Sequence, residues 1–387
     1  MKIYQSINQS INQSINQSIR LYVIIPVYNG KDFLETAVSS VLNQNLKQIK
    51  ILLVDDGSSD GSADLCDKLG KENDNVHVIH QKNGGVSAAR NTGIEAVFEM
   101  TAEYGNEDRS YIAFLDQDDF WQMHVIDDDS LSGDFDIIGF SSVSCNMKGT
   151  RFSTLCEYSS NEFLFPERGT LKWIWGGHMG AHFYRTSMLK EFRLRFLAGC
   201  IYCQDVIFIR QAVFCASGFK TISKFLYIYR TNAGSMVHQH SRDIEDTLLT
   251  PKDWRSVKDW SYQYKDEFSE QQKDAWEKSC EAYVGARILE AAGLLTEYGF
   301  PYDEVMQAVK DHGFLVYLNQ LKESDLAGWQ KPELAMLRND KDQFVKTHIS
   351  AGRRRRLLEK ARSAFPFLIP VYEKKRYPLK KIPGETA

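Results

Sequence analysis

The stretch YIAFLDQDD at residues 111–119 is the most informative part of this sequence. Its first five residues are apolar and rich in β-forming types, so they predict a short buried strand. The strand then ends in three aspartates within four positions, Asp116, Asp118 and Asp119. Such closely spaced carboxylates repel each other unless a cation or several hydrogen-bond donors lie among them. The stretch therefore indicates either a site for a hard divalent cation such as Mn²⁺ or Mg²⁺, or a solvated acidic turn.

The chain before this stretch alternates between strand and helix patterns. Such alternation predicts an α/β fold with a doubly wound, parallel sheet. In a sheet of this kind the polar turns that follow the strands lie at one edge, where ligands bind. We expect strands at 22–25, 51–54, 76–80 and 111–115, and helices at 33–42, at 62–70 and from Val86 onward.

Four motifs in the same region resemble those of a known family. In chain order they are VIIPVYN at 23–29, LVDDGSSDG at 53–61, NGGVSAARN at 83–91 and FLDQDD at 114–119. Together they resemble the nucleotide-sugar-binding half of the family-2 inverting glycosyltransferases, strongly over about residues 21–125 and more weakly to about residue 240. The resemblance implies the GT-A fold, a doubly wound, mostly parallel sheet flanked by helices.

The first two motifs suggest how a donor base is held. Tyr28 can pack on a uracil face while the backbone from Pro26 to Asn29 follows the base. By resemblance, Asp56 accepts the uracil imide N–H. Plain core packing is the alternative for Tyr28.

The next two motifs suggest a diphosphate site. Gly85 allows close backbone approach, at the start of a helix whose free N–H groups favour phosphate. Arg90 adds a planar cationic fork. The resemblance implies that Asp116 contacts the ribose and the metal, and that Asp118 holds the Mn²⁺ or Mg²⁺ that bridges the diphosphate.

The stretch CQDVIF at residues 203–208 supplies the candidate catalytic base. Family members usually carry Glu-Asp at this place before an apolar helix start, and the resemblance makes Asp205 the base for the acceptor hydroxyl. Gln204 replaces the usual Glu, so the role of that position is open. The alternative for Asp205 is a helix N-terminal residue favoured by the helix dipole.

Two further segments complete the expected site. YRTNAGS at 229–235 resembles the family's segment near the donor diphosphate, which implies donor contacts for Arg230 and Ser235. Aromatic side chains suit the apolar face of a sugar, so we expect WIWGGH at 173–178 to help form the acceptor site, with core packing as the alternative. The acceptor candidates are Trp173, Trp175, Gly177 and His178.

Both ends of the chain are unusual. Residues 5–19 repeat Gln-Ser-Ile-Asn, a low-complexity pattern that predicts disorder. A DNA tract of repeated CAAT tetranucleotides, read in successive frames, encodes this four-residue repeat. Gain or loss of one tetranucleotide would shift the reading frame and switch the gene off, as in phase-variable surface-antigen genes. Residues 353–381 carry eleven Lys and Arg against two Glu, with apolar residues between them. This segment suits an anionic membrane surface, and a solvated tail is the alternative.

Length and composition define the expected organisation. With 387 residues and 43% hydrophobic content, the chain can bury a large core. A pI near 6.2 argues against nucleic acid as a partner. We expect a repeat tail at 1–20, a nucleotide-sugar-binding half at 21–135, an acceptor-binding and catalytic half at 136–242, a helical extension at 243–349 and a basic amphipathic tail at 350–387.

The remaining features bear on location. The seven cysteines are scattered, and Cys200-X-X-Cys203 has no second pair at zinc-like spacing, so we expect free thiols in a reducing compartment. The sequence shows neither an apolar run of eighteen residues nor a signal-type leader. These features predict a cytoplasmic protein, with peripheral contact to the inner face of the cytoplasmic membrane.

The functional expectation is a metal-dependent inverting glycosyltransferase. Its partners would be a nucleotide-sugar donor, most simply a UDP-sugar, and a glycan or lipid-linked acceptor of a lipooligosaccharide or capsule. The rival from another class is a catalytically inactive nucleotide-sugar-binding scaffold that supports a partner transferase, and measured donor turnover would separate the two. A nucleotidyltransferase is disfavoured because no Gly-rich, basic loop follows the first strand.

Overall fold

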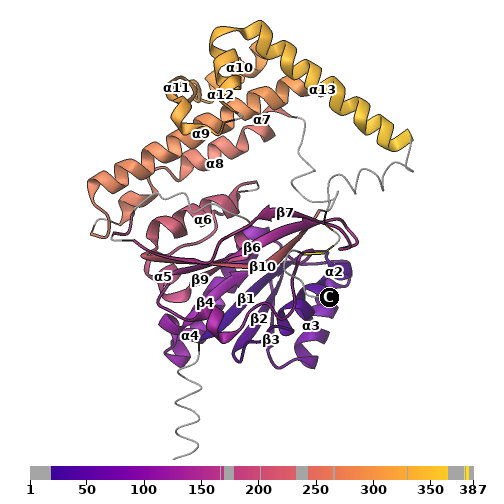
Figure 1. Ribbon diagram of the computed structural model, residues 1–387, viewed down its shortest axis with the longest axis vertical. Coiled ribbons are helices and arrows are strands. Elements are labelled where there is room, and N and C mark those ends of the chain that lie inside the picture. The colour runs from indigo at the N-terminus through magenta and orange to yellow at the C-terminus, as the bar shows by residue number, and fades with distance from the viewer. Residues whose placement is uncertain are drawn as a thin grey trace, which may run out of the picture. The chain divides into compact units, whose positions relative to one another are not determined.

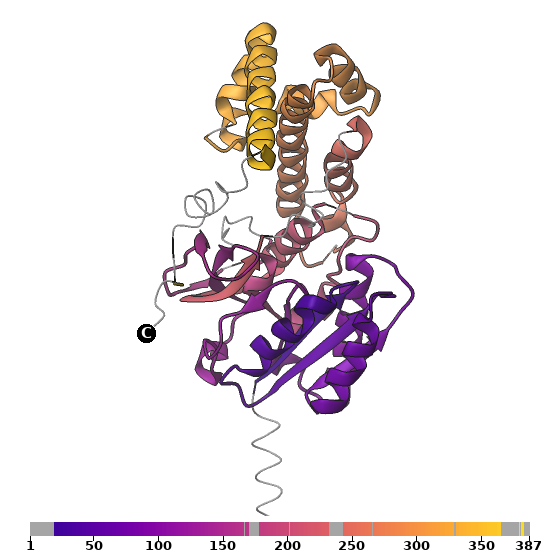
Figure 2. The same cartoon turned by 90° about the vertical axis from the view of Figure 1, so that its right-hand side faces the viewer.

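The structure is a computed structural model in two compact units (Figures 1 and 2). Unit 1 comprises Met1–Gly199, Gln204–Asn232 and Arg376–Ala387, and unit 2 comprises Cys200–Cys203 and Ala233–Lys375. The expected repeat tail lies outside the described residues apart from its last two positions, and most of the basic tail beyond residue 364 also lies outside them. The described residues are 19–165, 167–169, 178–200, 202–231, 243–264, 266–328, 330–364, 379 and 381–382.

Unit 1 is built on one sheet with the strand order β3-β2-β1-β4-β9-β6-β10-β5. The first four strands of this order are parallel, which confirms the α/β prediction for the first part of the chain. The other half is mixed, because β9 runs antiparallel to both β4 and β6. The strands are β1 (Arg20–Val27), β2 (Ile49–Asp55), β3 (Val76–His80), β4 (Ser110–Phe114), β5 (Phe120–Trp121), β6 (Ile137–Cys145), β7 (Phe152–Cys156), β8 (Asn161–Leu164), β9 (His182–Arg185) and β10 (Gly218–Arg230).

Alternating side chains of β1 face opposite layers of helices. Val23 and Ile25 pack with the apolar stripe of α2 (Lys31–Leu42) and with α3 (Ser62–Glu72). Ile24 faces the other way and meets Gly93 of α4 (Val86–Tyr104), where a methyl group added to the glycine would lie 2.5 Å from an Ile24 carbon. All three side chains of β1 are fully buried. Burial of each side chain stabilises the folded state by about 1.5–3 kcal/mol. Because both faces of β1 are covered, its sequence is a continuous apolar run.

Aromatic rings join the end of β4 to α6 (Gln204–Cys215). Phe114, the last residue of β4, makes edge contacts with Phe196 and Phe208, at centroid distances of 5.0 and 5.5 Å. Phe196 and Phe208 are themselves stacked at 4.2 Å. These rings fix the first turns of α6 beside the strand that carries the acidic stretch. A short helix, α5 (Thr186–Glu191), follows β9.

Unit 2 is helical, as expected, and α9 (Glu270–Tyr298) is its longest element. Ser269 and Gln272 form a capping box at its start, and Gly299, with φ of 102°, ends it. Trp254 and Trp276 are fully buried, which agrees with a core role. The other helices are α7 (Ile244–Thr247), α8 (Leu249–Ser256), α10 (Tyr302–Asp311), α11 (Leu315–Gln320), α12 (Lys331–Asn339) and α13 (Lys341–Ala364).

The last helix and the chain end differ from the expected organisation. Helix α13 runs continuously across the boundary expected at residue 349. The end of the chain belongs to unit 1, because Leu379 exchanges backbone hydrogen bonds of 2.8 and 2.9 Å with Phe152 of β7. Ile382 then joins a small apolar cluster with Val143 and Phe225. The expected tail therefore contains both a helix end and a strand-like anchor.

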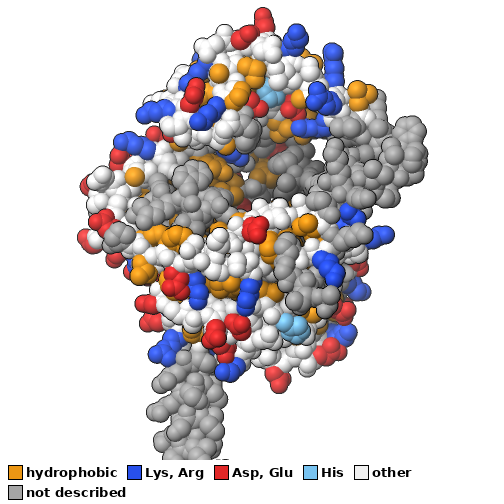
Figure 3. Space-filling view, in the orientation of Figure 1, with side chains coloured by type: hydrophobic (Ala, Val, Ile, Leu, Met, Phe, Trp, Pro, Cys, Tyr) orange, Lys and Arg blue, Asp and Glu red, His pale blue; other side chains and the backbone are white. Residues whose placement is uncertain are grey.

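Acidic and basic side chains are interspersed over the face seen in Figure 3. Among the described residues, every helix is too short or too polar to cross a bilayer.

Candidate functional site

The polar turns of the first three motifs lie at the carboxyl edge of the parallel strands. Val27 at the end of β1 is in register with Asp55 at the end of β2, and Ile24 is in register with Phe114 at the end of β4. The turns that follow these strands therefore open at the same edge of the sheet, as expected for a ligand site in an open α/β fold.

Gln117, between the two aspartates of the acidic stretch, holds the turn after β1. Its amide oxygen accepts a hydrogen bond from Tyr28 N at 2.9 Å, and its amide nitrogen donates to Tyr28 O at 2.8 Å. Gly30 leaves the room for this side chain, because a methyl group there would lie 2.2 Å from the Gln117 amide. Sequence reasoning did not assign Gln117 a role, since its partner is 89 positions away.

The turn itself presents Tyr28 outward. The Tyr28 side chain is 50% exposed, so core packing does not explain it. Asn29 adopts a left-handed backbone with φ of 50°, and its side-chain oxygen accepts a hydrogen bond from Ser59 N at 2.8 Å. Pro26 is a buried residue of β1. Tyr28 is thus available to a ligand, while Pro26 and Asn29 shape the turn beneath it.

Asp56 anchors the glycine turn before α4. One of its oxygens accepts from Gly84 N at 2.9 Å and from the Gln81 amide at 2.7 Å, and the other accepts from Gly85 N at 2.8 Å. Only 2% of Asp56 is exposed. In this arrangement the carboxylate faces backbone N–H groups of its own chain, so its contact with a base stays a prediction. Gly85 has φ of 85° and leaves open space where a side chain would stand.

Buried Arg90 forms an ion pair with the half-buried Asp116. An Arg90 guanidinium nitrogen lies 2.5 Å from an Asp116 oxygen, and the guanidinium also lies over the Phe196 ring at 5.1 Å. The other two guanidinium nitrogens of Arg90 have no hydrogen-bond partner among the described residues. Burial pushes the pKa of Asp116 upward, but the charge and hydrogen bond of Arg90, together with His178, hold that pKa below its ordinary value. Asp116 is therefore ionised at neutral pH.

Asp119 is the most buried of the three aspartates. It accepts hydrogen bonds from Tyr227 Oη at 2.5 Å and from Arg230 N at 2.7 Å. Burial, and then the charges of Asp118 and Asp116, raise the pKa of Asp119 well above its ordinary value. Asp119 thus ties the acidic turn to β10, a role that the sequence did not reveal because both partners lie more than a hundred positions away.

Arg230 supports the acidic turn from the opposite side. Its guanidinium donates to Asp118 O at 2.9 Å and to Met147 O at 2.7 Å, and it lies over the Phe120 ring at 4.9 Å. The side chain therefore braces the backbone of the turn, and its expected contact with a diphosphate stays a prediction. Ser235, the other residue expected there, lies outside the described residues.

His178, an expected acceptor residue, lies beside Asp116. Its Nε2 is 3.9 Å from an Asp116 oxygen, and its ring stacks on Tyr227 at 4.6 Å. Because Nδ1 accepts a hydrogen bond from Gly180 N, a neutral His178 carries its proton on Nε2, toward Asp116. Burial lowers the pKa of His178 despite the nearby charges of Asp116 and Asp205. The other acceptor candidates, Trp173, Trp175 and Gly177, lie outside the described residues.

The donor set fits a divalent cation in part. Ligand-type atoms of Asp116, Asp119 and His178 lie within 4.8 Å of one another, and Asp118 is not in that group. The carboxylates suit Mn²⁺ or Mg²⁺. His178, however, presents an N–H rather than a lone pair on the side of Asp116. The half-buried Asp118, in the same turn, remains the ligand that we expected.

Asp205 and His178 line the same pocket. The pocket has a volume of about 310 Å³. Asp205 lies in the first turn of α6 and accepts a hydrogen bond from Val206 N at 2.8 Å. The preceding Gln204 is buried, and its side-chain oxygen has no hydrogen-bond partner among the described residues. The full lining of the pocket is Leu155, His178, Met179, Asp205, Val206, Ile209 and Tyr229.

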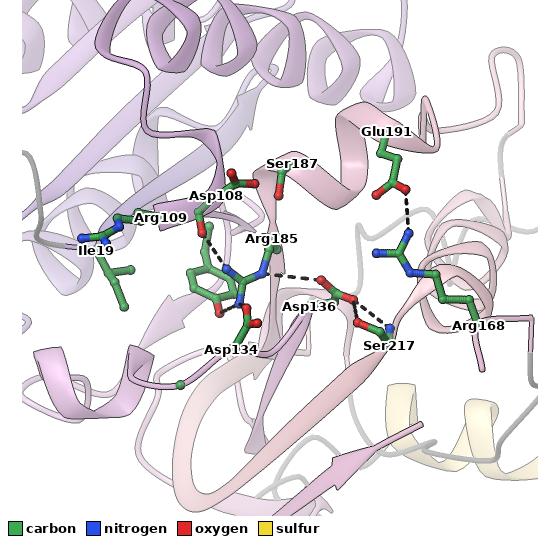
Figure 4. A pocket seen from close by; sticks show the side chains of 12 residues that line it. Ile19, Asp108, Arg109, Asp134, Asp136, Arg168, Arg185, Ser187, Glu191 and Ser217 are labelled. Carbon is green, nitrogen blue, oxygen red and sulfur yellow. Dashed lines mark hydrogen bonds and ion pairs between the residues drawn. The ribbon is translucent and has the colours of Figure 1, made fainter. Parts of the chain in front are cut away.

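A larger pocket of about 700 Å³ lies at the opposite edge of the sheet (Figure 4). Arg185 occupies its centre, with guanidinium hydrogen bonds to Asp108 O and Tyr111 Oη and an ion pair with Asp134 at 3.0 Å. The charges around Arg185 are thus paired with one another. Because the pocket opens where β1 and β4 begin, it is separate from the turns described above.

Comparison with known proteins finds relatives of this part of the chain. The model of "Glycosyl transferase family 2" matches residues 22–191. "Uncharacterized glycosyltransferase EpsJ" of Bacillus subtilis is 29% identical over 55% of this chain and 62% of its own length. "Minor teichoic acid biosynthesis protein GgaA" of the same organism is 26% identical over 62% of this chain and 51% of its own. The chain thus spans about half to three fifths of the length of these relatives.

A solved structure shares the fold. The crystal structure of S. aureus TarS 1-349 in complex with UDP superposes with a TM-score of 0.51 at 16% identity, covering 87% of this chain and 92% of that one. The sheet with its flanking helices is therefore the GT-A arrangement. With its matched motifs and their turns at one edge of the sheet, the segment 22–191 is a glycosyl transferase family 2 domain.

Proposed function

We propose that this chain is a metal-dependent inverting glycosyltransferase that moves a sugar from a nucleotide-sugar to a hydroxyl group of an acceptor glycan. The observation that carries the proposal is the placement of the acidic side chains. Asp116 and Asp118 follow β4 at the carboxyl edge of the sheet, and Asp205 lines a pocket with His178, which is in turn close to Asp116. The match of residues 22–191 to the glycosyl transferase family 2 model supports a transferase rather than a scaffold.

For the donor we propose a UDP-sugar. The exposed face of Tyr28 offers a platform for a base. The turn at Gly84 and Gly85, which Asp56 fixes, leads directly into α4, and a helix N-terminus favours phosphate. Arg90 has guanidinium N–H groups without a partner among the described residues, so a ligand oxygen has donors to meet there.

For the metal we propose Mn²⁺ or Mg²⁺ held by Asp118 and Asp116. Support comes from two carboxylates in one turn at the ligand edge of the sheet. When bound, such an ion would neutralise the charge that develops on the departing nucleotide diphosphate. Arg230 holds the turn in shape, because its backbone N–H donates to Asp119 and its guanidinium donates to Asp118 O.

Asp205 is the proposed base. Its carboxylate takes the proton of the acceptor hydroxyl while that oxygen forms a bond to the anomeric carbon. The bond from the anomeric carbon to the diphosphate oxygen breaks, and its electron pair leaves with the nucleotide. Because the attack comes from the face opposite the nucleotide, the configuration is inverted in a single step. Neutral His178, in the same pocket, is placed to orient the acceptor through Nε2–H.

For the acceptor we propose a bacterial surface glycan, such as a lipooligosaccharide or capsule, on a lipid carrier. The name of the relative GgaA refers to teichoic acid biosynthesis, which is cell-surface polymer chemistry. The four-residue repeat at 5–19, which a tetranucleotide repeat in the gene would encode, is consistent with switchable expression of a surface antigen. We also propose that the basic segment at 353–381 contacts the anionic membrane that holds such an acceptor.

A donor-hydrolysis screen tests the proposal. UDP-, GDP-, dTDP- and CMP-sugars are incubated with the purified chain, with Mn²⁺ or with a chelator, and nucleotide release is measured. We expect release from one UDP-sugar, lost in the chelator. Release that persists in excess chelator would overturn the metal assignment. The absence of turnover with every donor, despite tight nucleotide binding, would favour the scaffold. NMR of the product should show an inverted anomeric configuration.

A further inference from the structure

Unit 2 contains a second group of metal-ligand side chains, unrelated to the acidic turn. Cys200 and Cys203 flank the start of the segment that leads into α6, and Asp253 lies on α8. The two sulfur atoms are 3.7 Å apart, and Cys203 Sγ is 4.0 Å from an Asp253 oxygen. The Cys200 thiol also hydrogen-bonds the same carboxylate. Ligand atoms of all three residues lie within 4.8 Å of one another.

The distances match the edges of a zinc tetrahedron. With Zn–S bonds of about 2.3 Å and tetrahedral angles, two sulfur ligands stand about 3.8 Å apart, and the observed separation is 3.7 Å. A Zn–O bond of about 2.1 Å requires a sulfur–oxygen edge of about 3.6 Å, so Asp253 needs to approach Cys203 by only a few tenths of an ångström.

The same distances exclude a disulfide in this state, because S–S bonds are about 2.05 Å long. Both cysteines are more than nine-tenths buried, and Asp253 is partly exposed. An ion can therefore reach the group from the side of the carboxylate while the sulfur atoms stay dry. Two thiolates and a carboxylate are ligands that Zn²⁺ accepts and Mg²⁺ does not favour.

We propose that Cys200, Cys203 and Asp253 form a zinc site, with water in the fourth position. The C-x₂-C spacing is typical of zinc ligands. The sequence did not reveal the site because the third ligand is a lone aspartate fifty positions downstream. The proposal concerns unit 2 alone and does not rest on the transferase reaction. Its structural consequence is that zinc would link the segment Cys200–Cys203 to α8 through Asp253.

Metal analysis of the full chain, purified without chelator, tests the site. We expect about one zinc ion per chain by inductively coupled plasma mass spectrometry. Replacement by Co²⁺ should give the intense visible bands of a four-coordinate site and a sulfur-to-cobalt charge-transfer band. Cys203→Ser and Asp253→Asn should each weaken Co²⁺ binding by at least about tenfold, since even outer-shell changes cost that much. Cys280→Ser, which alters another buried cysteine of unit 2, should leave it unchanged.

Several results would overturn the proposal. These are a zinc content near zero together with no charge-transfer band, metal binding that the Cys203→Ser variant leaves intact, or a Cys200–Cys203 disulfide in freshly purified protein by mass spectrometry. If Asp253→Asn does not fold, as judged by circular dichroism, the Cys200→Ser variant supplies the same comparison. Because every readout is metal content or a cobalt spectrum, a failed transferase assay does not affect the outcome.

Discussion

Replacing Asp205 with Asn tests the proposed base at the scale of one residue. The change keeps the shape of the side chain and removes its ability to take a proton. A positioned base contributes about 10²–10⁴-fold to rate, so we expect transfer to fall at least a hundredfold while donor affinity barely changes. Steady-state transfer and donor binding by calorimetry measure the two effects separately.

The competing explanation is that Asp205 merely begins a helix. Asn serves well in that position, so a purely structural role predicts that Asp205→Asn retains its activity. Asp243→Asn is a matched control, because Asp243 caps α7 by accepting a hydrogen bond from Glu245 N at 2.8 Å. That control should leave transfer unchanged.

Gln117 offers a second prediction, which concerns donor binding. Gln117→Ala removes the two hydrogen bonds that fix the turn carrying Tyr28. Each is worth about 0.5–1.5 kcal/mol, so we expect the donor KM to rise about tenfold with a smaller change in kcat. Gln307→Ala, at an exposed position of α10, is the control. An unchanged KM would show that the turn holds its shape without the clamp.

The acidic residues proposed for the site could be chosen from the sequence, whereas the contacts that hold them could not. Asp116 and Asp205 could be chosen from the sequence because each stands in a short motif beside a regular element. Asp56 and Arg230 could be chosen too, but in the structure both side chains form hydrogen bonds with backbone groups of other turns. Such contacts depend on which segments the fold brings together, and one sequence does not contain that information.

At the scale of an element, Gly93 sets how closely α4 approaches β1. In Gly93→Ala the new methyl group would lie 2.5 Å from Ile24, and both positions are buried. Overpacking of this kind costs about 1–3 kcal/mol, which exceeds the roughly 1 kcal/mol that Ala gains over Gly in a helix. We expect a lower free energy of unfolding by urea titration. Gly328→Ala, with open space around it, should change stability by less than about 0.5 kcal/mol.

His182 at the start of β9 gives stability a pH dependence. Burial lowers its pKa from 6.5 to about 4, and its two ring nitrogens contact His178 O and Tyr158 Oη. Between those values the unfolded chain binds a proton that the folded chain does not. The free energy of unfolding should therefore fall as pH drops from about 6.5 to about 4, by up to about 3 kcal/mol.

The His182→Gln variant isolates that contribution. Urea unfolding at several pH values should show a shallower decline in the variant than in the parent chain, whatever the variant's stability at neutral pH. An equal decline of the unfolding free energy with pH in both proteins would mean that folding does not lower the pKa of His182. Half-buried His178, whose pKa is also lowered, acts in the same direction and remains in both proteins.

Local patterns predicted some elements better than others. Strands β1, β2 and β4 were found from their apolar runs because almost all of their residues are buried, and β3 was found although it is a half-buried edge strand. The mixed half was not resolved, because β10 pairs with β5, β6 and β8, which all lie between residues 120 and 164, more than fifty positions before β10 begins. The extent of α13 was missed for a simpler reason. A charge boundary was taken for an element boundary, although four consecutive arginines are compatible with a helix.

At the scale of the whole molecule, the proposed membrane contact must be tested without disturbing the packing of unit 1. Deleting residues 351–387 would also remove Leu379 and Ile382, which pack in unit 1. Neutralising exposed Arg353 and Arg354 to Gln avoids that loss. At about 1 kcal/mol per charge, we expect roughly thirtyfold weaker binding to anionic vesicles by co-sedimentation.

The control for that experiment makes the same charge change elsewhere. Lys68 and Lys71, exposed on α3, are replaced by Gln. If the double lysine variant weakens vesicle binding equally, net charge rather than the basic segment is responsible. Added salt should also release the parent chain, since screening limits the reach of these charges to about 8 Å at physiological ionic strength.

The return of the chain end to β7 has a consequence for how the protein is made. Unit 1 is discontinuous, so a ribosome must complete the whole of unit 2 before Leu379 can pair with Phe152. Until then the apolar cluster around Val143 lacks Ile382 and the neighbouring strand β7 lacks its last partner. Contacts between such distant positions form slowly. The small apolar cluster of unit 1 is therefore completed only after all of unit 2 has been synthesised.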